Sequence, residues 1–143
     1  MAEARKTSLH LEVVTPRAAV LSDDVSSIVL PGWDGELEQY PSGRPLLCAL
    51  RPGRMICRHP GADKTYYVGG GYAEVLADRV VVLADECDPA DALDAKAGAE
   101  ALQEAMKALE EHRHDPYETL EPYLLAQKRA QARIDLGRSG PKG

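Results

Sequence analysis

The sequence contains no phenylalanine and one tryptophan, so aliphatic side chains and six tyrosines must fill most of a core. No apolar run approaches the roughly 20 residues that a membrane-spanning helix needs. The first ten residues have no apolar stretch after their basic residues, which argues against a secretory signal. Positive charge is also scarce: 17 Lys and Arg stand against 23 Asp and Glu in 143 residues, a net charge of −6. An acidic chain is poorly suited to pair with phosphates, so we expect no nucleic-acid partner.

Catalytic patterns are absent as well. The three cysteines, Cys48, Cys57 and Cys87, form an odd set without CxxC spacing. This favours buried, reduced thiols in a reducing compartment. No base or electropositive surround accompanies any of them, as a nucleophilic cysteine would require. Neither a Ser-His-Asp nor a paired-carboxylate arrangement can be argued from the sequence.

Three local patterns suggest ligand or partner sites. His112 and His114 lie near acidic residues, but imidazoles two residues apart on a helix diverge, so we expect no metal site. The run Gly69–Gly71 lacks a following Lys-Ser/Thr, which predicts a bulge or close backbone contact rather than a phosphate cradle. Trp33 lies in a predicted turn, where it is either an interface anchor or a cap on the edge of a sheet.

The composition changes sharply near Asp88. The 41 residues from Pro31 to Gly71 hold five Pro and eight Gly, whereas the segment from Pro89 to Leu136 holds three Pro and one Gly. The first part is therefore predicted to consist of strands and turns, and the second of helices. We expect an α+β protein with a β-sandwich in residues 1–87 and a helical domain in residues 88–143.

Short apolar runs separated by turn signals fill the first part and are typical of an antiparallel sandwich or flattened barrel. No run is followed by a helix until the end of this part, so a parallel βαβ sheet is disfavoured. The predicted strands are Leu9–Thr15, Ala19–Leu21, Val25–Leu30, Pro45–Leu50, Arg54–Arg58, Thr65–Val68, Tyr72–Leu76 and Val80–Leu83.

The helical part is predicted to be an antiparallel two-helix hairpin. Asp88 and Pro89 are suited to cap and begin a first helix that runs to about His112. For the second helix, either Asp115 begins a short turn and the helix proper starts at Pro122, or one helix is kinked at that proline.

Gly137 is the predicted terminator of the second helix, and a frayed tail follows from about residue 137. Alanine dominates the facing surfaces of the two helices, so the hairpin should bury little apolar area and open without a large penalty.

Charge in the helical part is polarised. Residues 88–121 hold ten acids and three bases, net −7, and residues 122–143 hold five bases and one acid, net +4. Either the two helices attract each other across the hairpin, or the basic second helix seeks an acidic partner.

Several short segments of the sequence are not decisive one by one, but their occurrence together in one order is specific. The chain opens with LHLEVVTPRAAVLSDDVSSIVLPG, continues with GELEQYPSGRPLL, LRPGRM, GGGYAEV and DRVVVLADE, and ends in the predicted hairpin. From Leu9 to Leu136 it resembles the epsilon subunit of the F-type rotary ATP synthase, called delta in mitochondria. The loop GELEQYPSGRPLL occupies the place of that family's usual GELG-x-YPGHAPLL.

The resemblance implies a sandwich of about ten strands and a rotor part in the central stalk of a proton-translocating ATP synthase, bound to the gamma subunit and the c-ring. Such a subunit has no catalytic residues and no resident cofactor or metal. It couples rotation of the c-ring to the catalytic head and restrains ATP hydrolysis through its helices. Its expected place is the cytoplasmic face of a bacterial inner membrane, held there by partners and touching the membrane only indirectly.

The family's contacts can be carried over to matching positions. The residues implied on the c-ring and gamma side are Glu36, Glu38, Tyr40 and Arg44. With the hairpin extended, the residues implied to face the alpha/beta catalytic head are Lys128, Arg129 and Arg133.

The loop departs from the family pattern at two places. Ser42-Gly43-Arg44 replaces Gly-His-Ala, and Glu38-Gln39 replaces a Gly-aliphatic pair. Contacts on the ring side are therefore expected to be rearranged.

Regulatory ATP binding is the second implied property. The nucleotide-binding variants of the family carry Ile/Leu-Asp-x-x-Arg-Ala in the first helix. Asp94 matches, but Ala97 takes the place of the arginine, and in the second helix Arg129 and Arg133 keep only part of the pattern. Losing one cation weakens a phosphate clamp, and these three charged residues are otherwise solvated helix-face charges.

Two other functions remain as alternatives. One is a freestanding nucleotide-sensing module whose hairpin closes on ATP. The other is a small hydrolase or metal enzyme on a β-sandwich, for which no residue set can be named.

Overall fold

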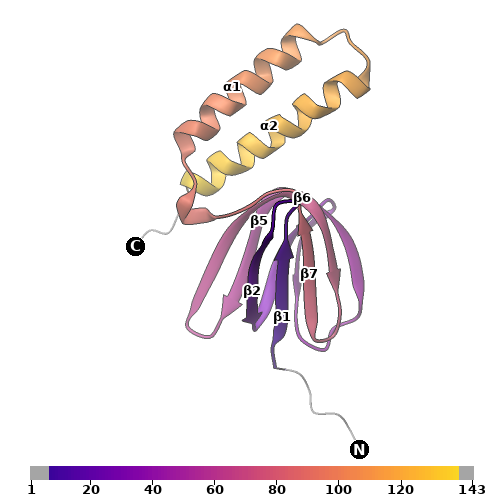
Figure 1. Ribbon diagram of the computed structural model, residues 1–143, viewed down its shortest axis with the longest axis vertical. Helices are drawn as coiled ribbons and strands as arrows, with labels where there is room; N and C mark the ends of the chain where they lie inside the picture. The colour runs from indigo at the N-terminus through magenta and orange to yellow at the C-terminus, as the bar shows by residue number, and fades with distance from the viewer. Residues whose placement is uncertain (1–6, 139–143) are drawn as a thin grey trace, which may run out of the picture. The chain divides into compact units, whose positions relative to one another are not determined.

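Strands make up the first part of the chain and helices the second in the computed structural model (Figure 1). The structure describes residues 7–138 and divides into two units, residues 1–89 and 90–143. The strands are β1 Leu9–Val14, β2 Ala19–Val25, β3 Ser27–Gly32, β4 Gly35–Gln39, β5 Leu46–His59, β6 Ala62–Val75, β7 Arg79–Ala84 and β8 Cys87–Pro89. The helices are the 3₁₀ helix η1 Ala90–Ala92, α1 Ala95–Glu111 and α2 Tyr117–Arg138.

The first unit is one sheet with the strand order β2-β1-β7-β6-β5-β3-β4, and β8 pairs with β6. β5 and β6 are 14 residues long and pair along their length. The second half of β6 also pairs with β7, and the second half of β5 with β3, so this ribbon belongs to both layers of a sandwich. The core side chains are Leu9, Leu11, Val13, Val25, Ile28, Leu30, Leu50, Met55, Cys57, Val68, Ala73, Val75, Val80, Val82 and Ala84.

The corner of the sandwich lies where β5 and β6 pass from one layer to the other. In β5 the core-facing positions change from even-numbered residues such as Leu50 to odd-numbered ones such as Met55, which is the shift that a bulge produces. In β6, Gly71 has a φ of 134°, and a Cβ there would lie 2.0 Å from the carbonyl oxygen of Leu83. The predicted close backbone contact is therefore confirmed at Gly71.

The predicted fold class is confirmed, but three details of the strands are wrong. The expected breaks at Arg51–Gly53 and Gly69–Gly71 do not end strands, because glycine lets the backbone bend while the ladder continues. β4 and β8 form where no strand was predicted, and the total is eight rather than about ten. β1 pairs with β7 in parallel, so the sheet is not purely antiparallel. These two strands are distant in sequence, and no hairpin turn fixes their relative direction.

The start of the first helix also differs from the prediction. Asp88 and Pro89 do not begin it, because Cys87–Pro89 pairs with β6 as a strand. The N-cap of α1 is Asp94, whose carboxylate accepts a hydrogen bond from the backbone N–H of Lys96 at 2.9 Å.

The second helix is continuous and contains Pro122, so the predicted alternative in which the helix proper starts at Pro122 is wrong, and a kink at the proline stays a prediction. Gly137 does not end it, since α2 continues to Arg138. A Cβ on Gly137 would lie 3.4 Å from the Cβ of Ala95, which is an ordinary van der Waals distance, so Gly137 lies beside the start of α1. The tail predicted from residue 137 is thus helical at its first two residues, and residues 139–143 lie outside the described part.

Small residues line the contact between α1 and α2. A Cβ on Gly98 would lie 3.1 Å from Cγ1 of Ile134, and Ala105 and Ala130 are buried. Met106, a large apolar residue of α1, is 53 % exposed. Within residues 7–138, no helix is both long enough and apolar enough to cross a membrane.

Candidate interaction surfaces

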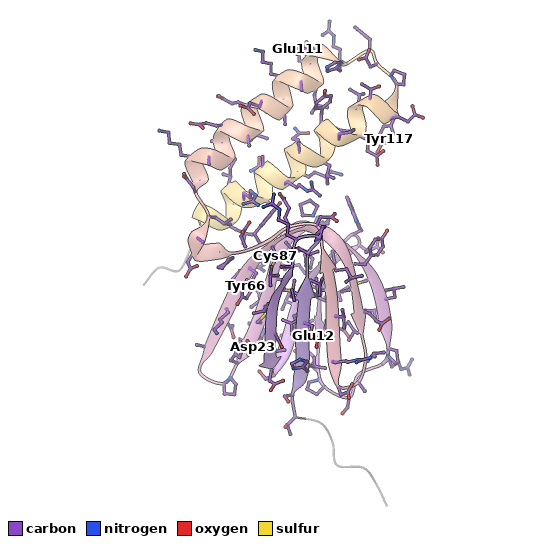
Figure 2. The ribbon with its side chains drawn as sticks, viewed as in Figure 1. Glu12, Asp23, Tyr66, Cys87, Glu111 and Tyr117 are labelled. Atoms are coloured by element: carbon purple, nitrogen blue, oxygen red, sulfur yellow. The ribbon has the colours of Figure 1, made fainter. Side chains whose placement is uncertain are left out.

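Exposed aromatic side chains are common in this aromatic-poor chain. Of one tryptophan and six tyrosines, four are exposed: Trp33, Tyr40, Tyr72 and Tyr117. Aromatic residues are enriched at the buried centres of protein interfaces and in their hot spots. Three of the four lie in the strand unit, whereas Tyr117 begins α2, across the short link from Glu111 (Figure 2).

An apolar row crosses the outer face of one sheet layer. Val14 of β1 is the register partner of Leu83 in β7, Leu83 of Tyr72 in β6, and Tyr72 of Ala49 in β5. The backbone N–H of Trp33 donates to the carbonyl oxygen of Ala49 at 3.2 Å, so the backbone of this residue lies next to the end of the row. We call these five residues the apolar band.

The apolar band has the character of a docking surface. The side chains of Leu83, Tyr72 and Trp33 are each at least half exposed, although neighbouring positions on the inner face are fully buried. Leu47, 71 % exposed, lies on the same face beside Glu74. Contiguous exposed apolar residues with polar neighbours mark sites of protein association.

A second feature lies on the other layer, where arginines of β5 reach across β3 to glutamates of β4. Arg54 donates from Nε to Oε2 of Glu36 at 2.6 Å and from a terminal nitrogen to Oε1 at 3.0 Å. This bidentate geometry is the strongest form of the pair. The hydrogen bonds from Arg54 hold the pKa of Glu36 below its usual value.

The second pair is part of a longer network. Arg58 donates to Oε2 of Glu38 at 2.5 Å and to Asp63 at 2.7 Å, and the hydroxyl of Ser27 donates to the same Glu38 oxygen at 3.0 Å. Hydrogen bonds from Arg58, then Ser27, lower the pKa of Glu38. We call the Arg54–Glu36 and Arg58–Glu38 pairs the β3 clasp.

The structure brings three of the four predicted ring-side residues into or beside this clasp. Glu36 and Glu38 belong to it, and Tyr40 follows Glu38 by two residues, where the Glu38 carboxylate raises the pKa of its hydroxyl. Arg44 is exposed four residues farther along and lies outside the clasp. Glu38 departs from the usual pattern of this loop. The clasp explains how the carboxylate is accommodated, because the guanidinium of Arg58 provides the opposite charge.

The predicted residues of the helical unit are placed as follows. Asp94 caps α1, while Lys128 is exposed and Arg129 and Arg133 are half-buried one turn apart on α2. The turn of α1 at Gly98 contacts α2 next to the two arginines. A role of these residues in binding ATP or a catalytic head stays a prediction.

The histidines of the link have a local role. His112 is the C-cap of α1, its ring lies 2.7 Å from the Asp115 carboxylate, and it stacks on Tyr123 with 5.2 Å between ring centroids. These contacts tie the end of α1 to α2. Across residues 7–138, no group of three His, Cys, Asp or Glu side chains has the arrangement of a metal site.

The cysteines are poor nucleophiles in this fold. Burial raises the pKa of Cys57 to about 12 and that of Cys87 to about 11, and it also raises the pKa of Cys48. A thiol with so high a pKa is almost entirely protonated at neutral pH. Figure 2 shows Cys87 beside Tyr66, on neighbouring strands.

Sequence reasoning named Trp33, Glu36 and Glu38, but it missed the residues that join them in the two surfaces. Tyr72 and Leu83 were assigned to strands without a face, although alternation with the buried Ala73 and Val82 would have placed them outward. The sequence carried a weaker signal for the clasp, because no spacing of residues along the chain indicates that β3 will lie between β4 and β5.

Comparison with known proteins identifies the family of this chain. A sequence model described as "ATP synthase, Delta/Epsilon chain, beta-sandwich domain" matches residues 8–90. The chain belongs to the ATP synthase delta/epsilon chain family. The ATP synthase epsilon chain of Anaeromyxobacter sp. (strain Fw109-5) is 35% identical over 133 residues, which are 90% of this chain and 97% of that one. The epsilon chain of Herpetosiphon aurantiacus is 32% identical over 130 residues, 91% and 94% of the two chains. The resemblance read from the sequence is thus confirmed.

Solved structures of ATP synthases share the fold of this delta/epsilon chain. A chain in the Euglena gracilis mitochondrial ATP synthase, titled as OSCP/F1/c-ring, superposes with a TM-score of 0.77 at 19% identity and covers 91% of this chain and 81% of its own length. A chain of the Tetrahymena thermophila central stalk and c-ring gives a TM-score of 0.51 at 17% identity, with 87% and 99% covered.

Proposed function

We propose that this delta/epsilon family member is the epsilon subunit in the central stalk of a proton-translocating F-type ATP synthase. Its relatives are named epsilon chains and match it over nearly their whole length, which is the observation that supports the proposal most strongly. In this role it turns with the rotor and couples the c-ring to the catalytic head, at the cytoplasmic face of a bacterial inner membrane that it reaches only through its partners.

The two surfaces divide the rotor contacts between them. The apolar band suits the gamma subunit, because an apolar face with two exposed aromatic side chains favours a permanent interface. The β4 side suits the c-ring, because Glu36, Glu38, Tyr40 and Arg44 present polar and charged groups there. Polar contacts of this kind fix the register between partners more than they add affinity.

The helical unit is the proposed brake on ATP hydrolysis. The contact between α1 and α2 combines small residues such as Ala105 and Ala130 with the buried Ile134, so separating the helices exposes a limited apolar surface. Lys128, Arg129 and Arg133 would then meet acidic surfaces of the alpha/beta head. The nucleotide-sensor alternative has less support, because Asp94 caps α1 and Ala97 offers no cation to a phosphate.

Add-back of the chain to a rotary ATPase core that lacks it tests this function. The full chain should bind stoichiometrically and slow ATP hydrolysis. Leu83→Asp with Tyr72→Asp should abolish binding, while Val20→Asp, exposed on the same layer, should weaken it less. Replacing Lys128, Arg129 and Arg133 together by Gln should preserve binding and relieve inhibition. A wild-type chain that fails to bind the core would contradict the rotor assignment, and its melting would then be compared with and without ATP.

A further inference from the structure

Glu74 is an exposed carboxylate on the face that carries the apolar band. Its side chain forms no ion pair or hydrogen bond with any residue in the described range 7–138. The other described glutamates of the strand unit each contact a histidine, arginine or tyrosine side chain: Glu12, Glu36, Glu38 and Glu86. The charge of Glu74 is therefore left uncompensated on this face.

Apolar side chains surround this carboxylate in the sheet. Its register partners are Leu47 on β5 and Val81 on β7, and Tyr72 precedes it by two residues on the same face of β6. Side chains directly opposite each other on one face have Cβ atoms about 5 Å apart, so Leu47 and Val81 flank Glu74 closely. Arg79, two residues before Val81, stands diagonally to Glu74, but the two form no ion pair.

A partner that covers the apolar band also covers Glu74. Tyr72 belongs to the band and is the neighbour of Glu74 along β6, while Leu83 of the band is the second diagonal neighbour on β7. Taking a carboxylate out of water without an opposite charge is costly, and it would offset much of the gain from the apolar contacts. The partner therefore has to bring a positive charge to this place.

We infer that the gamma subunit presents a basic side chain to Glu74, beside the apolar band, and that this ion pair fixes how gamma docks. The inference rests on the proposed function and adds to it a residue that determines specificity. Apolar contacts are non-directional, whereas one charged pair among them selects a single register and disfavours other partners. Arginine suits this place better than lysine, because its weakly hydrated guanidinium can stack on Tyr72 while it donates two hydrogen bonds to the carboxylate.

The sign of one substitution tests the ion pair. Binding of the full chain is measured to a rotary ATPase core that contains gamma and lacks this subunit. For Glu74→Leu we expect at least about 30-fold weaker binding, because the cation of gamma is then buried without a partner. Glu74→Gln should weaken binding about tenfold, since its amide oxygen still accepts a hydrogen bond, and Glu74→Lys should abolish it. Equal or tighter binding of Glu74→Leu would overturn the inference, because a wider apolar surface would then be the better one.

Glu12→Gln is the matched control for net charge. Glu12 lies in the same row of the same face, two strands away, and already contacts His10. Its substitution should change affinity less than threefold and act on the association rate, whereas Glu74→Gln should act on the dissociation rate. Equal losses from the two substitutions would show only a general attraction to a basic partner and would also overturn the inference.

Two further measurements separate this inference from other failures. Urea unfolding of the free Glu74→Leu chain should show no loss of stability, because no side-chain contact of Glu74 is removed and leucine is at least as suited to a strand. Failure of the wild-type chain to bind the core would overturn the proposed function. If the wild-type chain binds and Leu83→Asp with Tyr72→Asp binds equally well, gamma docks on another face, and only the assignment of the apolar band and the role of Glu74 are wrong.

Discussion

Arg54 and Glu36 join across a strand that lies between them, with two hydrogen bonds of 2.6 and 3.0 Å. Their side chains cover the outward side of β3 near Pro31, which is buried although it faces away from the core. The pair therefore both holds the edge strand and shields the strand beneath it, as the aliphatic stem of an arginine allows.

Arg54→Gln should lower the free energy of unfolding by about 0.5–1 kcal/mol, because the pair is partly exposed and solvent screens it. Urea unfolding at neutral pH and low salt measures the loss. Arg79→Gln, which removes an exposed arginine from β7, should leave the free energy of unfolding nearly unchanged. Equal losses in the two variants would mean that the clasp contributes nothing beyond net charge.

The clasp also predicts a pH dependence. The pKa values of Glu36 and Glu38 lie below the usual 4.5, chiefly because Arg54 and Arg58 bond to the ionised forms. A depressed folded-state pKa contributes stability that is complete above the unfolded pKa and is lost as pH falls through the folded value. Stability should therefore decline below about pH 4.5, and less steeply in the double variant Glu36→Gln with Glu38→Gln. Unfolding curves from pH 3 to pH 7 would show whether the two slopes differ.

The sandwich and the hairpin could be predicted because their periods differ and each repeats many times along the chain. Where a second interaction competed with a local signal, the prediction was wrong. Asp88 and Pro89 have ideal helix-start chemistry, yet pairing with Tyr66–Val68 makes them strand. Gly137 has ideal helix-stop chemistry, yet α2 continues to Arg138 while Gly137 lies beside Ala95 of α1. The clasp depends on which strands become neighbours, and that information does not reside in any short segment.

Gly71, at the corner of the sandwich, allows a test of whether the backbone there requires glycine. Gly71→Ala should destabilise the sandwich by at least about 2 kcal/mol, because the Cβ would meet the Leu83 carbonyl at 2.0 Å and φ is 134°. Gly61→Ala is the matched control, since φ is +88° there but nothing lies within 4 Å of the added Cβ. It should cost only about 1 kcal/mol, from the strained φ alone. Thermal unfolding that gave equal losses would show that the close approach at Gly71 relaxes without cost.

The packing between α1 and α2 can be tested at Gly98. A Cβ there would lie 3.1 Å from Cγ1 of Ile134, so Gly98→Ala sets a helix-propensity gain of about 1 kcal/mol against crowding, and the two nearly cancel. Gly98→Leu adds atoms that the buried contact cannot accept and should separate the helices. Ala99→Leu places the same side chain at an exposed position and should leave them together. Hydrogen exchange of the α2 amides would then speed up only in Gly98→Leu, because those amides stay protected only while the helices remain packed. If the hairpin is the brake, the same variant should alter inhibition of ATP hydrolysis while binding to the core stays intact.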